Sequence, residues 1–217
     1  KFVVSTGPNG GGKSTLAKTI AGILQPEKGQ ILLDGEDITG MNITERAKKG
    51  ISFAFQQPVR FKGITVLDLI RISVGHDLTV SQACEYLSEV GLCARDYIHR
   101  EVNSSLSGGE LKRIEIATSL ARSAPLSIFD EPEAGIDLWS FSMLIKRFEQ
   151  IHKEKKQSLI LISHQERIIR MADRIMVIGD GKVEAVGTAD EIVPILFGKK
   201  PESCGCRIQK GGELYER

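Results

Sequence analysis

A glycine-rich stretch near the beginning of the sequence has the composition and spacing of a phosphate-binding loop. It matches the pattern G-x-x-x-x-G-K-[ST] and comprises Gly7, Pro8, Asn9, Gly10, Gly11, Gly12, Lys13, Ser14 and Thr15. The glycines allow so tight a turn that successive N–H groups point at phosphate oxygens, and a helix beginning near Lys13 adds its positive end. Lys13 can then reach the β- and γ-phosphates, while the Ser14 hydroxyl can bind Mg²⁺. The stretch therefore predicts a site for a nucleoside triphosphate with Mg²⁺.

The same pattern would also fit a glycine turn without a ligand, but the strand-like run before it and the helical pattern after it disfavour that alternative. Kinases, GTPases, helicases and transport ATPases all use such a loop, so other residues must decide among them. Two carboxylates follow the buried-looking run 126–129: Asp130 suits Mg²⁺ coordination, and Glu131 can polarise an attacking water. Considered alone, this pair could equally be a solvated strand end.

Two further candidate segments are ambiguous when each is taken by itself. The run Leu106-Ser107-Gly108-Gly109-Glu110 can be a helix start capped by Ser107. His164 follows the strand-like run 159–162, and an isolated histidine is more often a packed or surface residue than a catalytic one. Their order along the chain, after the glycine-rich loop and around Asp130 and Glu131, is what gives them significance.

Taken together, these residues resemble the ABC ATPase family, and the resemblance covers nearly the whole chain. In that family a Leu-Ser-Gly-Gly signature opens a helix that faces the γ-phosphate bound on the opposite protomer, and Ser107, Gly108 and Gly109 match it. Phe55-Gln56 resembles the Q-loop, whose glutamine touches the metal and the attacking water. Gly135-Ile136-Asp137 is similar to the D-loop, which crosses the dimer interface, and His164 matches the switch histidine that contacts the γ-phosphate.

The resemblance implies an ATPase that uses ATP and Mg²⁺, with Glu131, His164 and Gln56 as catalytic residues. It also implies that Ser14, Gln56 and Asp130 hold the metal. The glycine-rich loop, Ser107–Gly109 and Asp137 would contact nucleotide, the last two groups across the interface with a second copy of the chain. Because the first residues already have the pattern of a buried strand, we expect the sequence to start after the family's adenine-stacking aromatic residue.

Three short runs resemble one branch of the family, the Suf-type iron-sulfur cluster assembly ATPase. They are 130–137, with an acid at Glu133 and a glycine at Gly135, 54–59 around Gln56, and 164–168 after His164. This resemblance implies a Suf-type scaffold protein as the partner, which ATP hydrolysis would reshape. The alternative is the ATP-binding subunit of an importer that docks on a membrane permease.

The elements that must position these residues follow a strand–helix alternation typical of an α/β fold. We expect a P-loop NTPase core with a mostly parallel sheet, an antiparallel β piece that turns at Asp34-Gly35, and a helical subdomain. The predicted division is a core at 1–65 and 104–197, a helical subdomain at 66–103 and a C-terminal tail at 198–217. The expected strands are 2–5, 31–33, 51–55, 126–129, 159–162 and 175–178.

Composition limits the partners. The 29 Lys and Arg residues nearly balance the 28 Asp and Glu residues, so we expect no general attraction for nucleic acid. The sequence shows neither a bilayer-length apolar run nor a secretory signal pattern, which predicts a cytoplasmic protein. Cys204 and Cys206 would provide half of a four-ligand metal shell, and we interpret them as ordinary thiols of the tail.

Overall fold

The structure, a computed structural model, describes residues 1–198 and is built around one large sheet. Its strands are β1 (Phe2–Thr6), β2 (Leu32–Leu33), β3 (Glu36–Asp37), β4 (Ile51–Ala54), β5 (Leu126–Asp130), β6 (Ser158–Ile162), β7 (Arg174–Gly179) and β8 (Lys182–Gly187). Six of them form a sheet of order β4-β5-β6-β1-β7-β8, parallel from β4 to β7 and closed by β8, which is antiparallel to β7. This architecture confirms the predicted fold class.

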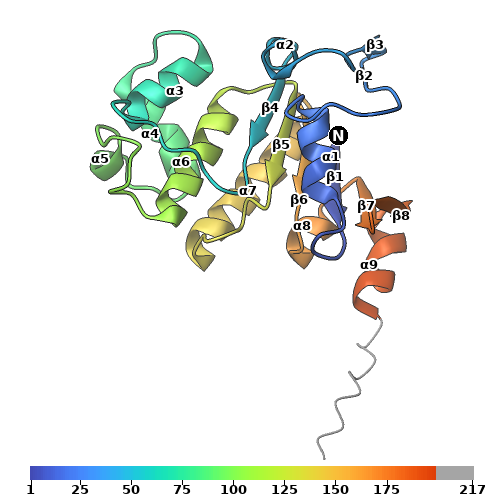
Figure 1. Ribbon diagram of the computed structural model, residues 1–217. Helices are drawn as coiled ribbons and strands as arrows, with labels where there is room; N and C mark the ends of the chain where they lie inside the picture. Colours follow the sequence, from blue (N-terminus) through green and yellow to red (C-terminus); the bar gives the residue numbers. More distant parts are fainter. Residues whose placement is uncertain (199–217) are drawn as a thin grey trace, which may run out of the picture.

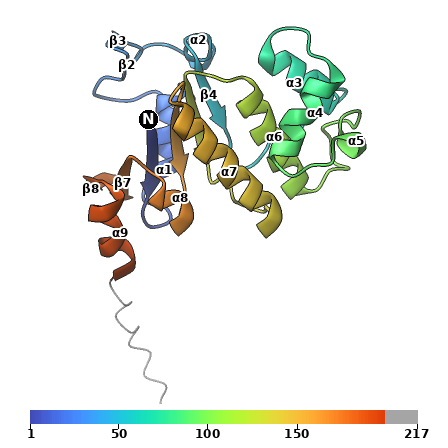
Figure 2. The ribbon, with the colours of Figure 1, turned by 180° about the vertical axis from the view of Figure 1, so that it is seen from behind.

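Helices cover both faces of this sheet. They are α1 (Lys13–Ile20), α2 (Ile43–Lys48), α3 (Val66–Val74), α4 (Val80–Glu89), α5 (Ala94–Tyr97), α6 (Gly108–Ala121), α7 (Leu138–Glu154), α8 (Glu166–Arg170) and α9 (Ala189–Gly198). Figure 1 shows α1 in front of the sheet, and the view from behind in Figure 2 shows α7 and α8 on the other side. No helix in the described part, residues 1–198, combines the length and the apolar character that a bilayer crossing requires.

The alternation of side chains in the central strands explains why helices pack on both faces. Ile128 of β5 and Ile162 of β6 share one apolar cluster with Ala17 of α1. The neighbouring residue Phe129 points the other way, and its ring lies 5.2 Å from that of Phe148 on α7. Each fully buried side chain of this size stabilises the fold by roughly 1.5–3 kcal/mol, so both layers are held by the same short strands.

The predicted hairpin is present, and a second one was missed. β2 and β3 pair antiparallel around Asp34 and Gly35, whose φ angles are 51° and 86°, as a two-residue turn with left-handed residues requires. The turn between β7 and β8 has the same form at Asp180 and Gly181, with φ of 47° and 72°. The strand after it lies at the sheet edge with most side chains exposed, so it lacks the buried apolar run that identified the other strands.

Residues 66–103 contain three of the helices, α3, α4 and α5. Ala83, Leu87 and Val90 are buried, and α3 and α4 both pack on α6. The chain enters and leaves this region at one place, where Thr65 pairs with Glu101 in an isolated antiparallel bridge. Buried residues of the region belong to the same apolar cluster as those of the sheet, and the division into core and helical subdomain stays a prediction.

The predicted tail 198–217 falls almost wholly outside the described residues. Gly198 is the last residue of α9, and Cys204 and Cys206 lie beyond it. The thiols Cys84 and Cys93 lie in or beside the helical region, Cys84 partly buried and Cys93 exposed.

Arg46 of α2 gives a test of how the loop between β3 and β4 is attached to α1. It is 0% exposed and donates hydrogen bonds to four backbone carbonyls, those of Met41, Thr39, Thr19 and Ile20. Because Arg46→Met leaves buried carbonyls without donors, we expect the free energy of unfolding to fall by about 3 kcal/mol, measured by urea denaturation.

Lys49→Met is the matched control, since it removes the exposed ion pair with Glu36 at 2.6 Å. Its effect should stay below about 1 kcal/mol. Equal losses for both variants would contradict a structural role for the buried guanidinium.

Candidate active site

The glycine-rich loop connects β1 to α1 and lies against the turn between β7 and β8. Gly7 has a φ of 130°, and a Cβ there would stand 2.1 Å from the carbonyl oxygen of Ile178. A Cβ on Gly11 would meet the same oxygen at 2.8 Å, and the carbonyl of Gly11 accepts a hydrogen bond of 2.9 Å from Gly181. The absence of side chains thus lets the backbone of this loop lie directly against the end of β7 and the turn after it, as the tight turn of a phosphate-binding loop requires.

The ammonium group of Lys13 lies inside this loop. Its Nζ donates to the carbonyl oxygens of Gly7 and Pro8, both at 2.8 Å, and the residue is 6% exposed. Burial lowers the pKa of Lys13, while the nearby carboxylates of Glu131 and Asp130 act in the opposite direction. Because the ammonium donates to neutral carbonyls and only lies near the carboxylates, its charge is available to an incoming anion.

Ser14 and Asp130 form the part of the site that can hold a cation. The hydroxyl of Ser14 donates to Oδ1 of Asp130 at 3.0 Å, and Asp130 is 1% exposed. Burial raises the pKa of this carboxyl. Its Oδ2 has no hydrogen-bond partner within the described part of the chain. A hydroxyl and an unpartnered carboxylate oxygen, both hard oxygen donors, fit Mg²⁺, and the residues present therefore suit the expected metal.

Glu131 lies directly after β5 in a backbone conformation that is rare outside glycine. Its φ is 47°, and its N–H donates to the carbonyl of Ile162 at 3.0 Å. Gln56 donates to Oε2 of this carboxylate at 2.6 Å, and Nε2 of His164 lies 4.0 Å from Oε1. The three residues proposed from the sequence as catalytic thus converge on one carboxylate, although they follow three different strands.

A cavity of about 300 Å³ collects most of the predicted nucleotide residues. Its lining consists of Asn9, Gly10, Gly11, Gly12, Lys13, Ser14, Thr15, Gln56 and Glu131. His164 lines the adjoining groove together with Gly7, Pro8 and Asn9, on the other side of the loop. The lining therefore combines the glycine-rich loop and the ammonium-bearing Lys13 with the amide of Gln56 and the carboxylate of Glu131.

Ser107, Gly108 and Gly109 lie elsewhere, at the start of α6. Ser107 caps this helix in a reciprocal pair with Glu110, so the reading of the run as a capped helix start is also correct. Ser107 and Gly108 are exposed. Among the described residues, none of the three lines the cavity of the glycine-rich loop. Asp137 is likewise a helix cap, with Oδ1 accepting hydrogen bonds of 3.0 Å from Trp139 and Ser140 at the start of α7.

Sequence reasoning missed several charged residues that support the site. Lys112 of α6 is 2% exposed and donates to the backbone carbonyls of Phe55 and, at 3.1 Å, of Asp130. Glu133, used in the sequence analysis only to identify the branch of the family, accepts a hydrogen bond of 2.6 Å from Ser163, the residue before His164. Lys112 and Glu115 stand one turn apart on a helix with many buried residues, and that charge spacing is the signal that could have found them.

The comparisons with known proteins agree with this geometry. A family model described as ABC transporter matches residues 1–134. The chain is 41% identical over 213 residues to the ABC transporter ATP-binding protein MJ0035 of Methanocaldococcus jannaschii, covering 94% of this chain and 84% of that protein. It is 34% identical to the sulfate/thiosulfate import ATP-binding protein CysA of Synechocystis sp., covering 88% of this chain and 54%, about half, of the relative.

The fold is also similar to a solved structure. The dimeric structure of MJ0796, described as a bacterial ABC transporter cassette, superimposes with a TM-score of 0.78 over 87% of this chain and 85% of that one, at 24% identity. Fold, family model and relatives together lead to one conclusion. The chain belongs to the ABC transporter family of ATP-binding proteins, and it is an ATPase that binds ATP with Mg²⁺.

Proposed function

We propose that this chain is the ATP-binding subunit of a transport machine, and that it hydrolyses ATP at sites shared between two copies packed head to tail. One observation carries the proposal. The cavity of the glycine-rich loop holds Lys13 and Glu131, whereas the signature turn, with Ser107 and Gly108 exposed, lies outside that cavity on the same copy. A second copy can supply the turn, and a twofold arrangement would complete two sites at once.

Within such a site each predicted residue has a role that its position supports. Backbone N–H groups of the loop and the Lys13 ammonium would hold the triphosphate. Ser14, Gln56 and Asp130 would hold Mg²⁺, which neutralises charge on the phosphates when it is bound. Glu131, held by Gln56, would orient or deprotonate the attacking water, and His164 would contact the γ-phosphate. The N-terminus of α6 would add partial positive charge from the second copy.

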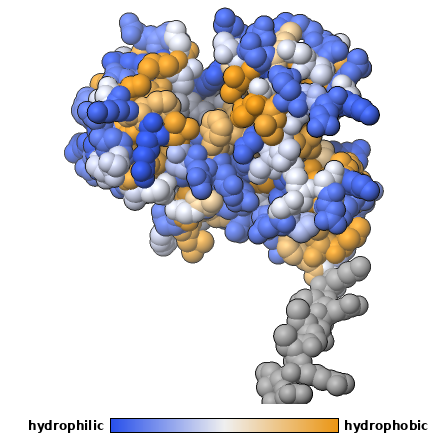
Figure 3. All heavy atoms as spheres, in the orientation of Figure 1, coloured by the Kyte–Doolittle hydropathy of each residue, from blue (hydrophilic) through white to orange (hydrophobic). Residues whose placement is uncertain are grey.

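A groove beside Gln56 supports a route by which hydrolysis moves a partner. Between β4, α3 and α6 lies a largely apolar cavity of about 220 Å³, lined by Phe55, Val59 and Phe61 among others. Val59 and Phe61 are partly exposed at its rim. Figure 3 shows apolar residues gathered beside a hollow between the helical region and the part that carries α2, β2 and β3. A partner segment seated there would contact the residues that adjoin Gln56.

The nature of the partner is supported by the relatives. CysA is named as an import ATP-binding protein, and another relative, 33% identical, as the ATP-binding protein EcfA2 of an energy-coupling factor transporter. These names favour a membrane permease, reached from the cytoplasmic side, over the Suf-type scaffold that the three short runs suggested. Because the chain spans only 54% of CysA, the transported substrate is not carried over from it.

The iron-sulfur assembly role stays a second candidate because of Glu133. The acid at this position, which the Suf-type resemblance rested on, also accepts hydrogen bonds from the hydroxyl of Ser163 and the N–H of His164. Glu133 therefore packs against the segment that carries His164 and is not an incidental surface residue.

Glu131→Gln tests the catalytic assignment. The amide cannot take up a proton from water, so kcat should fall by on the order of 100-fold or more while ATP binding persists, and ATP with Mg²⁺ should trap a dimer seen by size-exclusion chromatography. Glu166→Gln, which removes an exposed charge paired with Arg170, is the control and should hydrolyse ATP normally. An active Glu131→Gln enzyme, or one that stays monomeric with ATP, would count against the shared site.

Trp139 gives an optical test of dimer formation. The chain's one tryptophan is 84% exposed, and it lies two residues after Asp137. In the dimer its indole would be buried away from water. Trapping the Glu131→Gln variant as a dimer with ATP should therefore shift the tryptophan fluorescence emission to shorter wavelength. The Lys13→Met variant, which lacks the phosphate-binding ammonium, should show no shift. Unchanged emission from a chromatographically proven dimer would exclude this surface from the interface.

A pull-down separates the two candidate partners. The tagged chain, retrieved from detergent-solubilised cells, should bring with it a protein with several membrane-spanning segments, and Phe61→Glu should lose that protein because a charge enters the apolar groove. Leu24→Glu, at a comparably exposed apolar position outside the groove lining, is the control. Recovery of a soluble scaffold without a membrane protein would reverse the order of the two candidates.

A further inference from the structure

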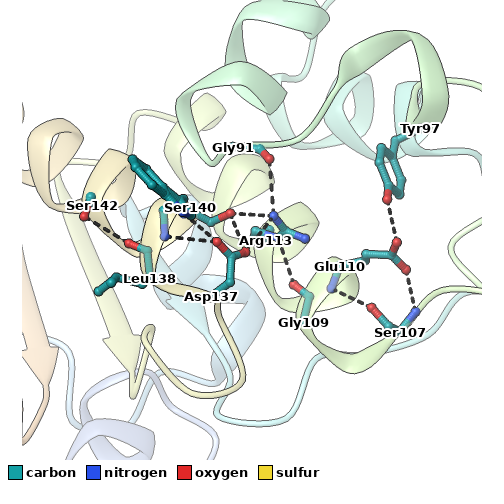
Figure 4. A network of polar contacts seen from close by, with 11 residues as sticks. Gly91, Tyr97, Ser107, Gly109, Glu110, Arg113, Asp137, Leu138, Ser140 and Ser142 are labelled. Carbon is teal, nitrogen blue, oxygen red and sulfur yellow. Dashed lines mark hydrogen bonds and ion pairs between the residues drawn. The ribbon is translucent and has the colours of Figure 1, made fainter.

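Arg113 has no role in the proposed mechanism, yet its side chain contacts the start of α6, the segment after α4 and the start of α7. It lies in the second turn of the signature helix α6, and its side chain is 16% exposed. One guanidinium nitrogen donates to Oγ of Ser140 at 2.6 Å and to the carbonyl of Gly91 at 3.2 Å, and it lies 3.4 Å from Oδ2 of Asp137. Nε donates back to Gly109 at 3.4 Å. Figure 4 shows these contacts converging on the one side chain.

The acceptors of Arg113 are themselves fixed. Ser140 donates its hydroxyl proton to Oδ2 of Asp137 at 2.7 Å, while Oδ1 of the same carboxylate caps α7. Hydrogen bonds from Ser140, first its N–H and then its hydroxyl, lower the pKa of Asp137, so this group is a carboxylate at neutral pH. Gly91 ends α4 in the left-handed conformation, with a φ of 74°. Its carbonyl lies just past the end of that helix, a place where a cation is favourable.

The segments around Arg113 also pack closely at two glycines. A Cβ on Gly109 would stand 2.5 Å from the carbonyl oxygen of Gly135, so the signature turn rests directly on the backbone of the segment 135–137. A Cβ on Gly91 would stand 2.8 Å from Oγ of Ser140. Because neither glycine position leaves room for a side chain, the backbones pack closely there, and we expect a shift of one segment to affect the other.

A second set of hydrogen bonds holds the signature turn but does not involve Asp137. Tyr97 of α5 donates to Oε1 of Glu110 at 2.5 Å, and Oε2 of Glu110 accepts from the N–H of Ser107 at 2.6 Å. The hydrogen bond from Tyr97 is the main reason why the pKa of Glu110 is lowered. Figure 4 shows this pair on one side of α6 and the Arg113 contacts on the other. Arg113 is thus the side chain of this network that joins the signature turn to Asp137.

We propose that Arg113 is a positioning residue for the reaction on a second copy. It holds the signature turn and Asp137 at a fixed position relative to each other, so that both contact the nucleotide bound by the other copy. The inference rests on the proposed shared site. The planar guanidinium is suited to this role because it presents several donors in a fixed fork, which a lysine cannot reproduce. Arg113 acts through Gly109 and Asp137 and touches no part of its own copy's cavity lining.

The test is a complementation between two defective chains. Arg113→Met should lower kcat by on the order of 10-fold or more, because small misplacements of charge-stabilising groups are costly, while the monomer still binds ATP. Lys13→Met should be inactive because it cannot hold the triphosphate. In mixed dimers, one site combines the intact loop of the Arg113→Met copy with the intact signature of the Lys13→Met copy. The mixture should therefore be more active than the sum of the two variants measured separately.

A signature variant separates failure of this inference from failure of the proposed function. Gly108→Asp places an acid in open space at the helix start, where it repels phosphate but does not disturb folding. Its mixture with Lys13→Met tests the shared site alone. If this mixture gains activity and the Arg113→Met mixture does not, Arg113 acts within its own copy and the inference is overturned. If neither mixture gains activity, the shared site itself is refuted.

Two further variants exclude a general loss of structure. Arg113→Lys keeps the charge but not the fork, and it should fold with a melting temperature near that of the unchanged chain yet show part of the kcat loss. Arg147→Met breaks another tie between helices α7 and α4, the ion pair with Glu89 at 3.0 Å, without contact to the signature turn or Asp137. It should leave kcat near that of the unchanged chain. A kcat loss in Arg147→Met as large as that in Arg113→Met would show that any weakened helix contact suffices, and would overturn the specific role.

Discussion

The site is organised around two opposite charges, the Lys13 ammonium and the Asp130 carboxylate, which influence each other but form no ion pair. Lys13 is buried against carbonyls of its own loop, and Asp130 is buried beside Ser14 with one oxygen lacking a partner in the described residues. Burial lowers the pKa of Lys13 and raises the pKa of Asp130, so in both groups it disfavours the charged form. A triphosphate carrying a cation supplies the missing partner for both groups at once. The folded chain already bears the free-energy cost of burying these two charges, and nucleotide binding relieves part of that cost.

The sheet explains how residues distant in sequence reach these charges. The glycine-rich loop follows β1, Gln56 follows β4, Glu131 follows β5 and His164 follows β6, and these four strands are parallel neighbours. Their carboxyl ends therefore open at one edge of the sheet, where ligands of such folds bind. The signature turn at the start of α6 does not line the cavity of the glycine-rich loop among the described residues, and for this reason we propose that a second copy completes the site.

Much of this arrangement was predictable because its signals are local. The glycine-rich loop, the carboxylates after a buried strand and the left-handed turn at Asp34-Gly35 each depend on a few adjacent residues. Strand β8 was missed because an exposed edge strand has no buried run, and Arg113 was missed because its partners come from α4 and α7. The three runs that suggested a Suf-type partner are equally short, whereas relatives that match most of this chain are named as ATP-binding proteins of import and energy-coupling factor transporters, on which our proposal of a permease rests.

The central claim, a nucleotide held by one copy and closed over by another, can be observed directly. An isotope-labelled Lys13→Met chain is mixed with the unlabelled chain, a photoreactive group on the γ-phosphate of an ATP analogue is activated, and modified peptides are identified by mass spectrometry. The account predicts adducts on the isotope-labelled peptide that contains Ser107–Gly109, because the analogue is bound by the unlabelled copy. Adducts confined to the unlabelled chain would contradict it.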